Sequence, residues 1–387
     1  MPTPSLLIVP ARFKTGKLYS QIPTSGAGDF TVTRNTTATR LNSAGLLESV
    51  ASGIPRLDYY TSGGVTGCPA LLVEPAALNL ALHSRDLTNA VWSGTNITTA
   101  KNAVGADGVA SGATTLTATA ASGTVLQSLS HGSFTRVFSA YVRRVTGTGA
   151  IQMTVNGGTN WDTVTISSAY TQVACLPRSV ASGTVGFRMA VSGDVIEVDF
   201  TQGEATTVTS PIPTTTGSVT RSADVISVSG AVSGSIGQTE GTLYAEVDLK
   251  NLGVAGAIVC VQTASILSGS VRIQSQATNQ LFVTVVDASG TTQYQKTISS
   301  PTLSAGINKI ALGYSSVASG VVTALNGSII DTGTVTASFG TLGANRVYLG
   351  VREASGNFSF FFNNRIRAAA LYTTRLTNAE LQSLTTL

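Results

Sequence analysis

Residues 30–92 read FTVTRNTTATRLNSAGLLESVASGIPRLDYYTSGGVTGCPALLVEPAALNLALHSRDLTNAVW. This stretch shows neither the apolar period of an amphipathic helix nor the long alternation of a half-buried strand. Arg34 and Arg40 lie in a Thr-rich segment that favours extended structure. Three X-Pro steps follow, and each disfavours helix at the residue before the proline. Because short extended pieces bury little apolar surface alone, we expect this stretch to become ordered by packing on something else; a series of surface hairpins is the alternative interpretation.

Four motifs follow one another in this stretch: T-R-x-T-x-A-T-R-x-N, G-L-x-E, P-R-L-D-Y and C-P-A-L-L-V-E-P. Their order resembles the leader of tailed-bacteriophage virion proteins, which precedes β-sandwich modules on tail fibres, tail appendages or head fibres. The resemblance implies that residues 1–92 form an N-terminal leader for virion attachment and assembly. The leader residues that it singles out are Arg34, Arg40, Asn42, Arg56, Asp58, Tyr59 and Glu74.

The composition favours a folded, β-rich chain. Of 387 residues, 42% are hydrophobic and 11% charged. This hydrophobic content argues against disorder, and the length suffices for two or three domains. The net charge of +4 is spread without a basic cluster, so we expect no nucleic-acid binding. The longest apolar stretch, near 71–82, is interrupted by Glu74, Pro75 and Asn79, so we expect no membrane insertion.

Residues 93–229 carry strand patterns at regular spacing. Apolar and polar residues alternate in four short runs, at 134–142, 151–155, 185–191 and 196–200. Asn156-Gly157 predicts a tight hairpin turn. Several short strands without a long helix indicate a sandwich or jelly roll. The run GDVIEVDFTQGE and the TSPIPTTTGSVTRSADVISVSG that follows it resemble the closing part of a carbohydrate-binding-module type of jelly roll.

Residues 230–239, GAVSGSIGQT, have the composition of a flexible linker. Beyond them, Asn326-Gly327 predicts a type I′ hairpin turn, and Thr377 with Glu380 predicts the capping box of a short C-terminal helix. The end of the chain, FSFFFNNRIRAAALYTTRLTNAELQSL, resembles the last strands and helix of concanavalin A-like or laminin-G-like lectin domains. We therefore predict a lectin-like domain over 240–387 that folds by itself.

Together these patterns predict an all-β fold class: an extended N-terminal leader followed by two β-sandwich (jelly-roll) domains, the last with a short C-terminal helix. The three cysteines, Cys68, Cys175 and Cys260, are widely spaced and form no C-x-x-C pair. We expect them to be free thiols.

The sequence offers weak candidates for catalysis. Glu197 and Asp199 share a face of an expected strand, as the acid and nucleophile of a glycosidase must. The third carboxylate, Glu204, comes too late and beyond Gly203, which does not match such sites. There is no nucleophile elbow, no zinc signature and no nucleotide-binding loop. We therefore predict no enzymatic activity, no metal and no cofactor.

Aromatic residues beside polar ones are the remaining candidates, because sugar-binding sites combine aromatic faces with amides and charged groups. Asn160, Trp161 and Asp162 have this composition. Tyr348 with Arg352 has it as well. The alternative is that these aromatic residues fill the interior of the sandwiches.

The resemblance implies a bacteriophage structural protein exposed on the virion and assembled in the host cytoplasm. Its partners would be other virion proteins, further copies of itself (a homo-oligomer, with a trimer favoured) and bacterial surface glycans. Two alternatives remain: a purely architectural capsid-decoration protein, and a secreted bacterial glycan-binding protein or glycosidase.

Overall fold

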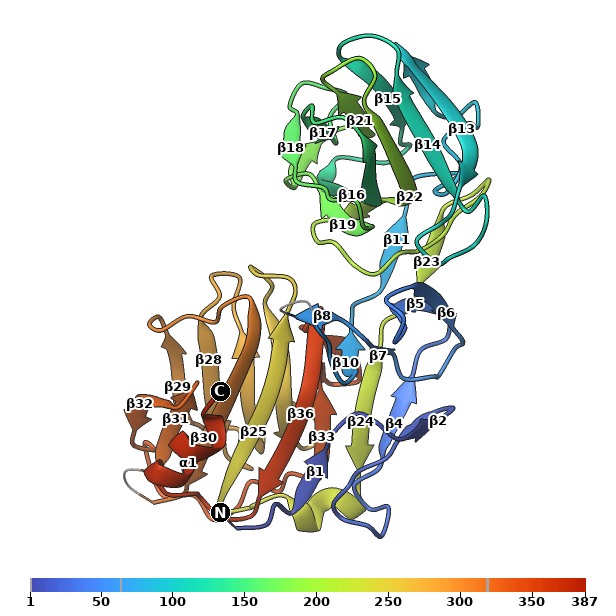
Figure 1. Ribbon diagram of the computed structural model, residues 1–387. Coiled ribbons are helices and arrows are strands. Elements are labelled where there is room, and N and C mark those ends of the chain that lie inside the picture. Colours follow the sequence, from blue (N-terminus) through green and yellow to red (C-terminus); the bar gives the residue numbers. More distant parts are fainter. Residues whose placement is uncertain (1, 63–64, 318–319) are drawn as a thin grey trace. The chain divides into compact units, whose positions relative to one another are not determined.

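The computed structural model describes residues 2–62, 65–317 and 320–387. The chain is all-β, as predicted, and its sheets are antiparallel; within the described ranges, helices are limited to η1 (Ala231–Ser235) and α1 (Asn378–Thr385) (Figure 1). The chain forms two compact units. The first contains Met1–Thr36, Val50–Pro75 and Ala223–Leu387, and the second contains Thr37–Ser49 and Ala76–Ser222.

The first unit contains an eight-stranded sheet in the order β32-β31-β30-β25-β36-β10-β7, with β1 also paired to β36. The bounds are β32 Ser328–Gly333, β31 Val321–Leu325, β30 Gly306–Ser315, β25 Glu240–Leu249, β36 Asn364–Tyr372, β10 Ala70–Val73, β7 Leu57–Asp58 and β1 Leu6–Ile8. Both β1 and β10 lie against β36, where Leu6 pairs with Leu371 and Leu71 with Ile366. Strands from the start of the chain therefore complete a sheet built mostly from its end.

The second sheet of this unit has nine strands in the order β2-β3-β4-β24-β33-β26-β27-β28-β29. The bounds are β2 Phe13–Lys14, β3 Lys17–Leu18, β4 Phe30–Thr33, β24 Val225–Ser229, β33 Arg346–Leu349, β26 Gly256–Gln262, β27 Ser270–Ser275, β28 Leu281–Val286 and β29 Thr292–Ile298. Two small hairpins join the unit, β8 Thr61–Ser62 with β9 Val65–Thr66 and β34 Arg352–Ala354 with β35 Asn357–Ser359.

One apolar core fills the space between these two sheets. The inward row predicted for β25, which is Leu243, Ala245, Val247 and Leu249, is buried in it. Phe30 of β4 and Leu71 of β10 lie in the same core. Helix α1 begins with the predicted capping box, in which Thr377 Oγ1 accepts from the Glu380 amide. Its Leu381 packs on the outer face of the eight-stranded sheet. Asn326 and Gly327 both have positive φ, 48° and 83°, as the predicted type I′ turn requires.

The second unit is a smaller sandwich. Its six-stranded sheet runs β13-β14-β22-β16-β19, with β20 also paired to β16, and its five-stranded sheet runs β12-β15-β21-β17-β18. The bounds are β13 Ile97–Ala103, β14 Ala113–Ala118, β22 Val195–Ala205, β16 Phe134–Thr146, β19 Thr171–Ala174, β20 Arg178–Val180, β12 Ser93–Thr95, β15 Gly123–Ser128, β21 Thr184–Met189, β17 Ile151–Thr154 and β18 Asp162–Val164. Two further pairs are β11 Ala77–Asn79 with β23 Val219–Arg221, and β5 Ala38–Leu41 with β6 Leu47–Val50.

The core of this unit contains most of the apolar residues expected from the sequence, including Phe138, Met153 and Phe187. Val191, at the end of the run 185–191, lies beyond β21 and is exposed. Phe200 differs from the expectation. Its φ of 48° breaks the alternation of β22, and its ring packs instead with Tyr141 in a separate cluster.

The boundaries of the expected leader and jelly roll differ from the structure. Residues 1–92 do not form a separate part, because their strands belong to the sheets of both units. The β24 strand, which we expected to close the jelly roll of 93–229, pairs with β4 and β33 in the first unit. Strand pairing uses backbone groups that every residue carries. The sequence pattern of one strand therefore does not specify which other strand it pairs with.

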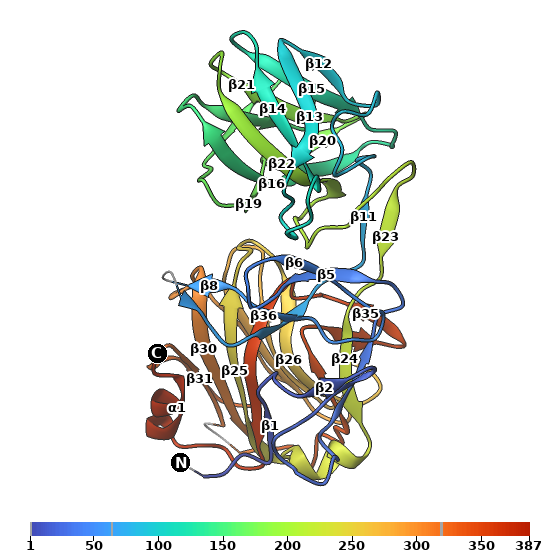
Figure 2. The ribbon, with the colours of Figure 1, turned by 45° about the vertical axis from the view of Figure 1, so that its right-hand side comes forward.

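The expected linker at 230–239 is also different. It contains η1, and Val232 and Ile236 are buried in the core of the first unit. A lectin-like domain limited to 240–387 would lack these residues and the strands β1, β4, β7, β10 and β24. Figure 2 shows β24 and β2 in the first unit, where β24 lies between β4 and β33 and β2 is the edge strand of the same sheet.

Cys68, Cys175 and Cys260 are all free, as predicted. In the part of the chain that the structure describes, no helix combines the length and apolar character needed to cross a membrane.

Candidate functional site

Three of the motif residues meet around Asp224. Arg34 Nη1 lies 3.0 Å from Asp224 Oδ1, and Arg56 Nη1 lies 2.6 Å from Glu74 Oε2. Arg56 also donates to Asp224, and so does the Glu74 amide at 3.0 Å. The four side chains are at most 2% exposed. Each buried charge here has an opposite charge within hydrogen-bond distance.

The carboxylates around Arg56 stabilise its charged form. Burial disfavours its charged form, but the adjacent Asp224 and Glu74 outweigh burial and raise the pKa of the guanidinium. Arg34 also donates to the carbonyl of Ile54 at 3.1 Å, and so ties the chain after β6 to the cluster. We call Arg34, Arg56, Glu74 and Asp224 the Asp224 cluster.

The next motif residue, Asp58, belongs to a second buried group. Arg365 Nε lies 2.6 Å from Asp58 Oδ2, and Arg365 Nη1 lies 2.9 Å from Asp248 Oδ2. The ring of Tyr60 lies 4.5 Å from the guanidinium carbon, whereas Tyr59 is half-buried. Asp58, like the Asp224 cluster, therefore ties the start of the chain to its end inside the first unit.

Arg40 and Asn42 belong to the second unit. Arg40 Nε lies 2.7 Å from Glu48 Oε1 across the β5–β6 pair. The Asn42 carboxamide oxygen accepts from the amides of Ala44 and Leu46 at 2.9 and 3.1 Å, which closes the hairpin turn. The structure thus divides the predicted leader residues among three places, and buries four of the seven.

The carboxylates considered for catalysis are each engaged separately. Glu197 accepts from Arg143 Nε at 2.5 Å, and Asp199 accepts from Arg85 Nε at 2.8 Å. Glu204 accepts from the Thr209 amide at 3.0 Å. Burial raises the pKa of Asp199, and it raises the pKa of Glu204 to about 7.

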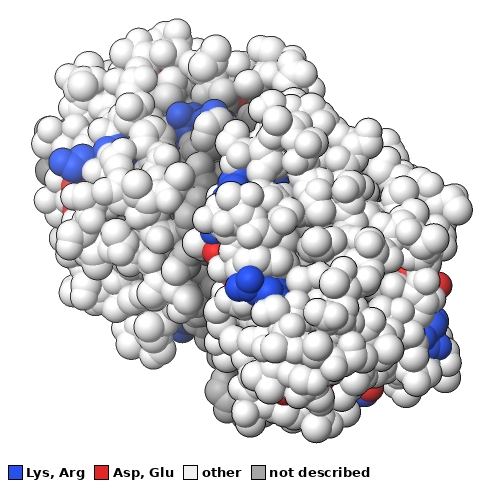
Figure 3. Space-filling model, turned by 90° about the horizontal axis from the view of Figure 1, so that it is seen from above, with Lys and Arg blue, Asp and Glu red and all other residues white. Residues whose placement is uncertain are grey.

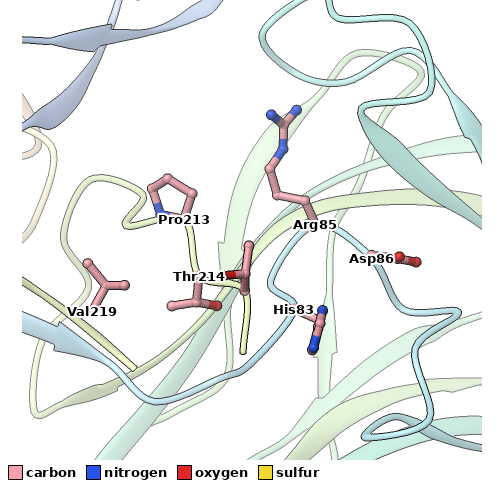
Figure 4. A pocket seen from close by; sticks show the side chains of 7 residues that line it. His83, Arg85, Asp86, Pro213, Thr214 and Val219 are labelled. Atoms are coloured by element: carbon pink, nitrogen blue, oxygen red, sulfur yellow. The ribbon is translucent and has the colours of Figure 1, made fainter. Parts of the chain in front are cut away.

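A pocket of about 320 Å³ lies in the second unit, lined by His83, Arg85, Asp86, Pro213, Thr214, Thr215 and Val219. Figure 4 shows the Arg85 guanidinium pointing away from His83 and Asp86. That guanidinium lies over the Phe200 ring at 4.1 Å and is bonded to Asp107 and Asp199. The Arg85 guanidinium is therefore already used by the fold. No group of three or more His, Cys, Asp or Glu residues is placed to hold a metal within the described ranges.

The outer face of the five-stranded sheet carries a connected polar row. Thr124, Arg188, Gln152 and Thr163 are cross-strand neighbours on successive strands, in that order. Arg188 Nε donates to Gln152 Oε1 at 2.7 Å, and Gln152 Nε2 donates to Thr163 Oγ1 at 3.3 Å. Because alternate residues of these strands fill the core, this row faces outward.

Trp161 lies at the edge of this row. Its ring is 4.7 Å from the Arg188 guanidinium carbon. The tight turn expected at Asn156-Gly157 is part of a longer loop instead, since β17 ends at Thr154 and β18 begins at Asp162. The carboxamide of Asn156 bonds to the amide and side chain of Asn160, at 2.9 Å each. At Gly158, with φ 90°, a Cβ would approach the Trp161 ring to 3.0 Å, so glycine permits the loop to close against the ring.

Asp162 turns away from this face. Its carboxylate accepts from Arg178 Nη2 at 2.6 Å and from the Leu176 amide at 2.8 Å. The hydrogen bond from Arg178 lowers the pKa of Asp162. We call Trp161, Arg188, Gln152 and Thr163, with Thr124, the Trp161 face. Sequence reasoning missed Arg188 and Gln152, although their outward positions in the alternating runs 184–189 and 151–154 marked them.

The other predicted pair lies in the first unit. Tyr348 is 3% exposed, and its hydroxyl donates to Glu353. Burial raises the pKa of Tyr348 to about 12. Arg352 instead lies over the Phe360 ring, 3.6 Å from its centroid. Tyr348 is thus an interior residue, whereas Arg352 remains partly exposed.

The surface is sparsely charged. On the face shown in Figure 3, Lys, Arg, Asp and Glu side chains form small separate groups, and most of the surface consists of uncharged residues. This agrees with the 11% of charged residues in the sequence.

No family model matches this chain, and no curated protein matches it. Among solved structures, it is similar to the CBM40 of the Ruminococcus gnavus IT-sialidase bound to alpha2,3 sialyllactose, with 16% identity over 39% of this chain and 84% of that one, and a TM-score of 0.35. It is also similar to the NanB sialidase of Streptococcus pneumoniae, with 13% identity over 41% of this chain and 26% of that one, and a TM-score of 0.36. A native heptameric SAP-like pentraxin from Limulus polyphemus gives 15% identity over 38% of this chain and 70% of that one, with a TM-score of 0.30. At these identities and scores, the similarities assign neither a function nor a ligand to this chain.

Proposed function

We propose that this chain is a non-enzymatic structural protein on the surface of a tailed-bacteriophage virion, and that its second unit contacts bacterial surface glycans. The virion role is supported by the succession of leader motifs between residues 33 and 75. The non-enzymatic role is supported by Glu197, Asp199 and Glu204, each of which is bonded to its own partners inside the fold.

The Trp161 face is the observation that carries the glycan contact. A sugar ring has apolar C–H faces and polar hydroxyls, so it needs an aromatic surface beside donors and acceptors. Trp161 supplies the aromatic surface, and Arg188, Gln152 and Thr163 supply the polar groups. Several copies on one particle would make weak contacts effective, because linked sites bind at a high effective concentration.

The glycan contact is tested by Trp161→Ala in the full chain, measured on an immobilised panel of bacterial surface polysaccharides. Loss of stacking and of the cation–π contact should weaken retention about tenfold. Phe134→Ala is the matched control, since Phe134 is an aromatic residue that likewise lies beside an arginine, Arg136, but is on β16 in the other sheet. Phe134 is exposed, whereas Trp161 is half-buried. Equal retention of the two variants, or no retention of the parent protein, would contradict the proposal.

The virion role is tested by labelling intact particles with an antibody against this chain. We expect label at a defined site on the tail or head, and sedimentation of the purified chain as a homo-oligomer, with a trimer expected. Particles that carry no label, although the chain is expressed in infected cells, would contradict the virion role while leaving the glycan contact to its own test.

A further inference from the structure

Two arginines lie on the outer face of the nine-stranded sheet without an acidic partner. Arg272 of β27 is the cross-strand neighbour of Cys260 on β26. Arg352 begins the β34–β35 hairpin, and its Nη1 lies 3.5 Å from the carboxamide oxygen of Gln274, two residues beyond Arg272 on the same face. Burial lowers the pKa of Arg272, and the like charge of Arg352 lowers it further.

Neither guanidinium is satisfied by the protein. The Nε atoms of Arg272 and Arg352 are buried and have no hydrogen-bond acceptor within the described ranges. Their remaining polar contacts are long: 3.5 Å from Arg272 Nη1 to the Ile266 carbonyl, and the 3.5 Å contact with Gln274. Glu353, next to Arg352 in sequence, is already bonded to Arg346 at 2.9 Å and to Tyr348.

This arrangement is costly for the free protein. Burial lowers the pKa of both guanidiniums, because no carboxylate in the described part of the chain offsets the loss of water. A buried donor without an acceptor lowers the stability of the fold, and more so when it is charged. A bound anion would restore the missing partner, and guanidinium binds a carboxylate through two parallel hydrogen bonds.

Aromatic rings flank the same place. The Phe360 ring centroid lies 3.6 Å from the Arg352 guanidinium carbon, and that of Phe282 lies 5.8 Å from the Arg272 guanidinium carbon. Phe360 is 39% exposed and has φ 54°, a conformation that bulky residues rarely adopt. Its carbonyl accepts from the Ala257 amide at 2.8 Å, which holds this backbone in place. The site therefore offers positive charge and aromatic surface together.

We propose that Arg272 and Arg352, with Gln274, Phe282 and Phe360, bind the carboxylate and ring of an acidic sugar in a bacterial surface polysaccharide. The guanidiniums would hold the carboxylate, the Gln274 carboxamide a hydroxyl, and the partly exposed Phe360 side chain the C–H surface of the ring. This inference rests on the proposed glycan contact and extends it to the first unit and to charged sugars.

The test uses the full chain on a panel of uronic-acid and nonulosonic-acid oligosaccharides, each beside its carboxyl-reduced, neutral counterpart. The parent protein should retain at least one acidic member about tenfold more strongly than its reduced counterpart. Arg272→Met should abolish this preference. Arg352→Lys keeps the charge but loses the planar fork, and should weaken the preference. Arg12→Met is the matched control, because Arg12 is an exposed arginine of the same unit that lies over the Tyr19 ring, and it should leave the preference unchanged.

The outcomes separate this inference from the proposed function. Thermal unfolding first establishes that each variant is folded. If Arg272→Met does not fold, Arg352→Lys still tests the site. Lack of any preference for acidic members, or a preference that survives in both variants, would overturn the acidic-sugar site. Inorganic phosphate that displaces the oligosaccharide at equal concentration would also overturn it, since a site for any small anion would then be present. Retention that depends on Trp161 but not on Arg272 would uphold the proposed function and reject this site, and the reverse would uphold this site alone.

Discussion

The Asp224 cluster and the Arg272–Arg352 pair place arginines in opposite surroundings. In the cluster, Arg34 and Arg56 lie within hydrogen-bond distance of Asp224 and Glu74. In the pair, Arg272 and Arg352 have aromatic rings beside them but no carboxylate among the residues that the structure describes. A buried charge that stabilises a fold needs its counter-charge in the same chain. For the Arg272–Arg352 pair, which lacks it, the acidic sugar proposed above would bring the counter-charge.

Removing the cluster as a whole should have the largest effect. A chain limited to 240–387 keeps Arg272 and Arg352 but loses Arg34, Arg56 and Asp224, together with strands β1, β4, β7, β10 and β24. Because β36 and β33 would then present unpaired edges over an open core, we expect no cooperative thermal unfolding of this fragment. The first unit is discontinuous, so the matched control is the full chain. A cooperative transition in the fragment would show that the cluster and its strands are dispensable.

Asp224→Asn should have the next largest effect. It leaves two buried guanidiniums without their shared counter-charge, and breaking a buried ion pair costs about 3–5 kcal/mol. The free energy of unfolding from denaturant titration measures this loss. Lys17→Met is the control, because the Lys17–Asp29 pair is at 3.7 Å and its lysine side chain is 39% exposed, so its loss should cost less than about 1 kcal/mol. Similar losses for the two variants would remove the distinction between the regions.

Glu204 tests in the second unit whether burying the charge of a carboxylate lowers the stability of the fold. Burial raises its pKa from the usual 4.5 to about 7, although Thr209 donates to it. Between these values the folded state holds a proton that the unfolded state has released. The stabilising contribution is therefore complete below about pH 4.5 and is lost as the pH rises through about 7, by at most about 3 kcal/mol. Unfolding free energies measured from pH 4.5 to 8 should fall in the parent protein and remain flatter in Glu204→Gln. Parallel pH profiles would contradict the assignment.

Arg272→Met should have the smallest effect on stability. Whether it lowers or raises the stability is the sharpest test of the difference between the Asp224 cluster and the Arg272–Arg352 pair. Within the described ranges, the Arg272 guanidinium has few hydrogen bonds and no counter-charge to offset its loss of water. Replacing it by an apolar side chain of similar length should therefore leave the midpoint of thermal unfolding unchanged or raise it. Arg56→Met, which leaves Asp224 and Glu74 without their shared arginine, should lower the midpoint. A decrease for Arg272→Met as large as that for Arg56→Met would mean that Arg272 is a structural residue.

The candidate sites show the same division between local and distant information. Trp161 was found from composition alone, and its neighbour Asn160 holds the loop that presents it. Arg188 was missed because it lies on β21, a later strand, and joins the row only through the pairing of β17 with β21. Gln152 was missed although it lies on β17, the strand just before the loop that carries Trp161. Asp162 was included because it follows Trp161, yet its partner Arg178 lies on another strand and turns it away.

The sequence by itself determined what depends on near neighbours. The all-β class, the inward row of β25, the Asn326-Gly327 turn and the Thr377–Glu380 capping box follow from alternation, positive φ and hydrogen bonds within a few residues. Only the tertiary structure decided which strands share a sheet and which charges share a partner. Arg56 finds Glu74 nearby but Asp224 168 residues away. Every residue offers the same backbone groups for strand pairing, so a strand's own sequence does not specify which distant strand it pairs with. The pairing is selected only when the whole core forms.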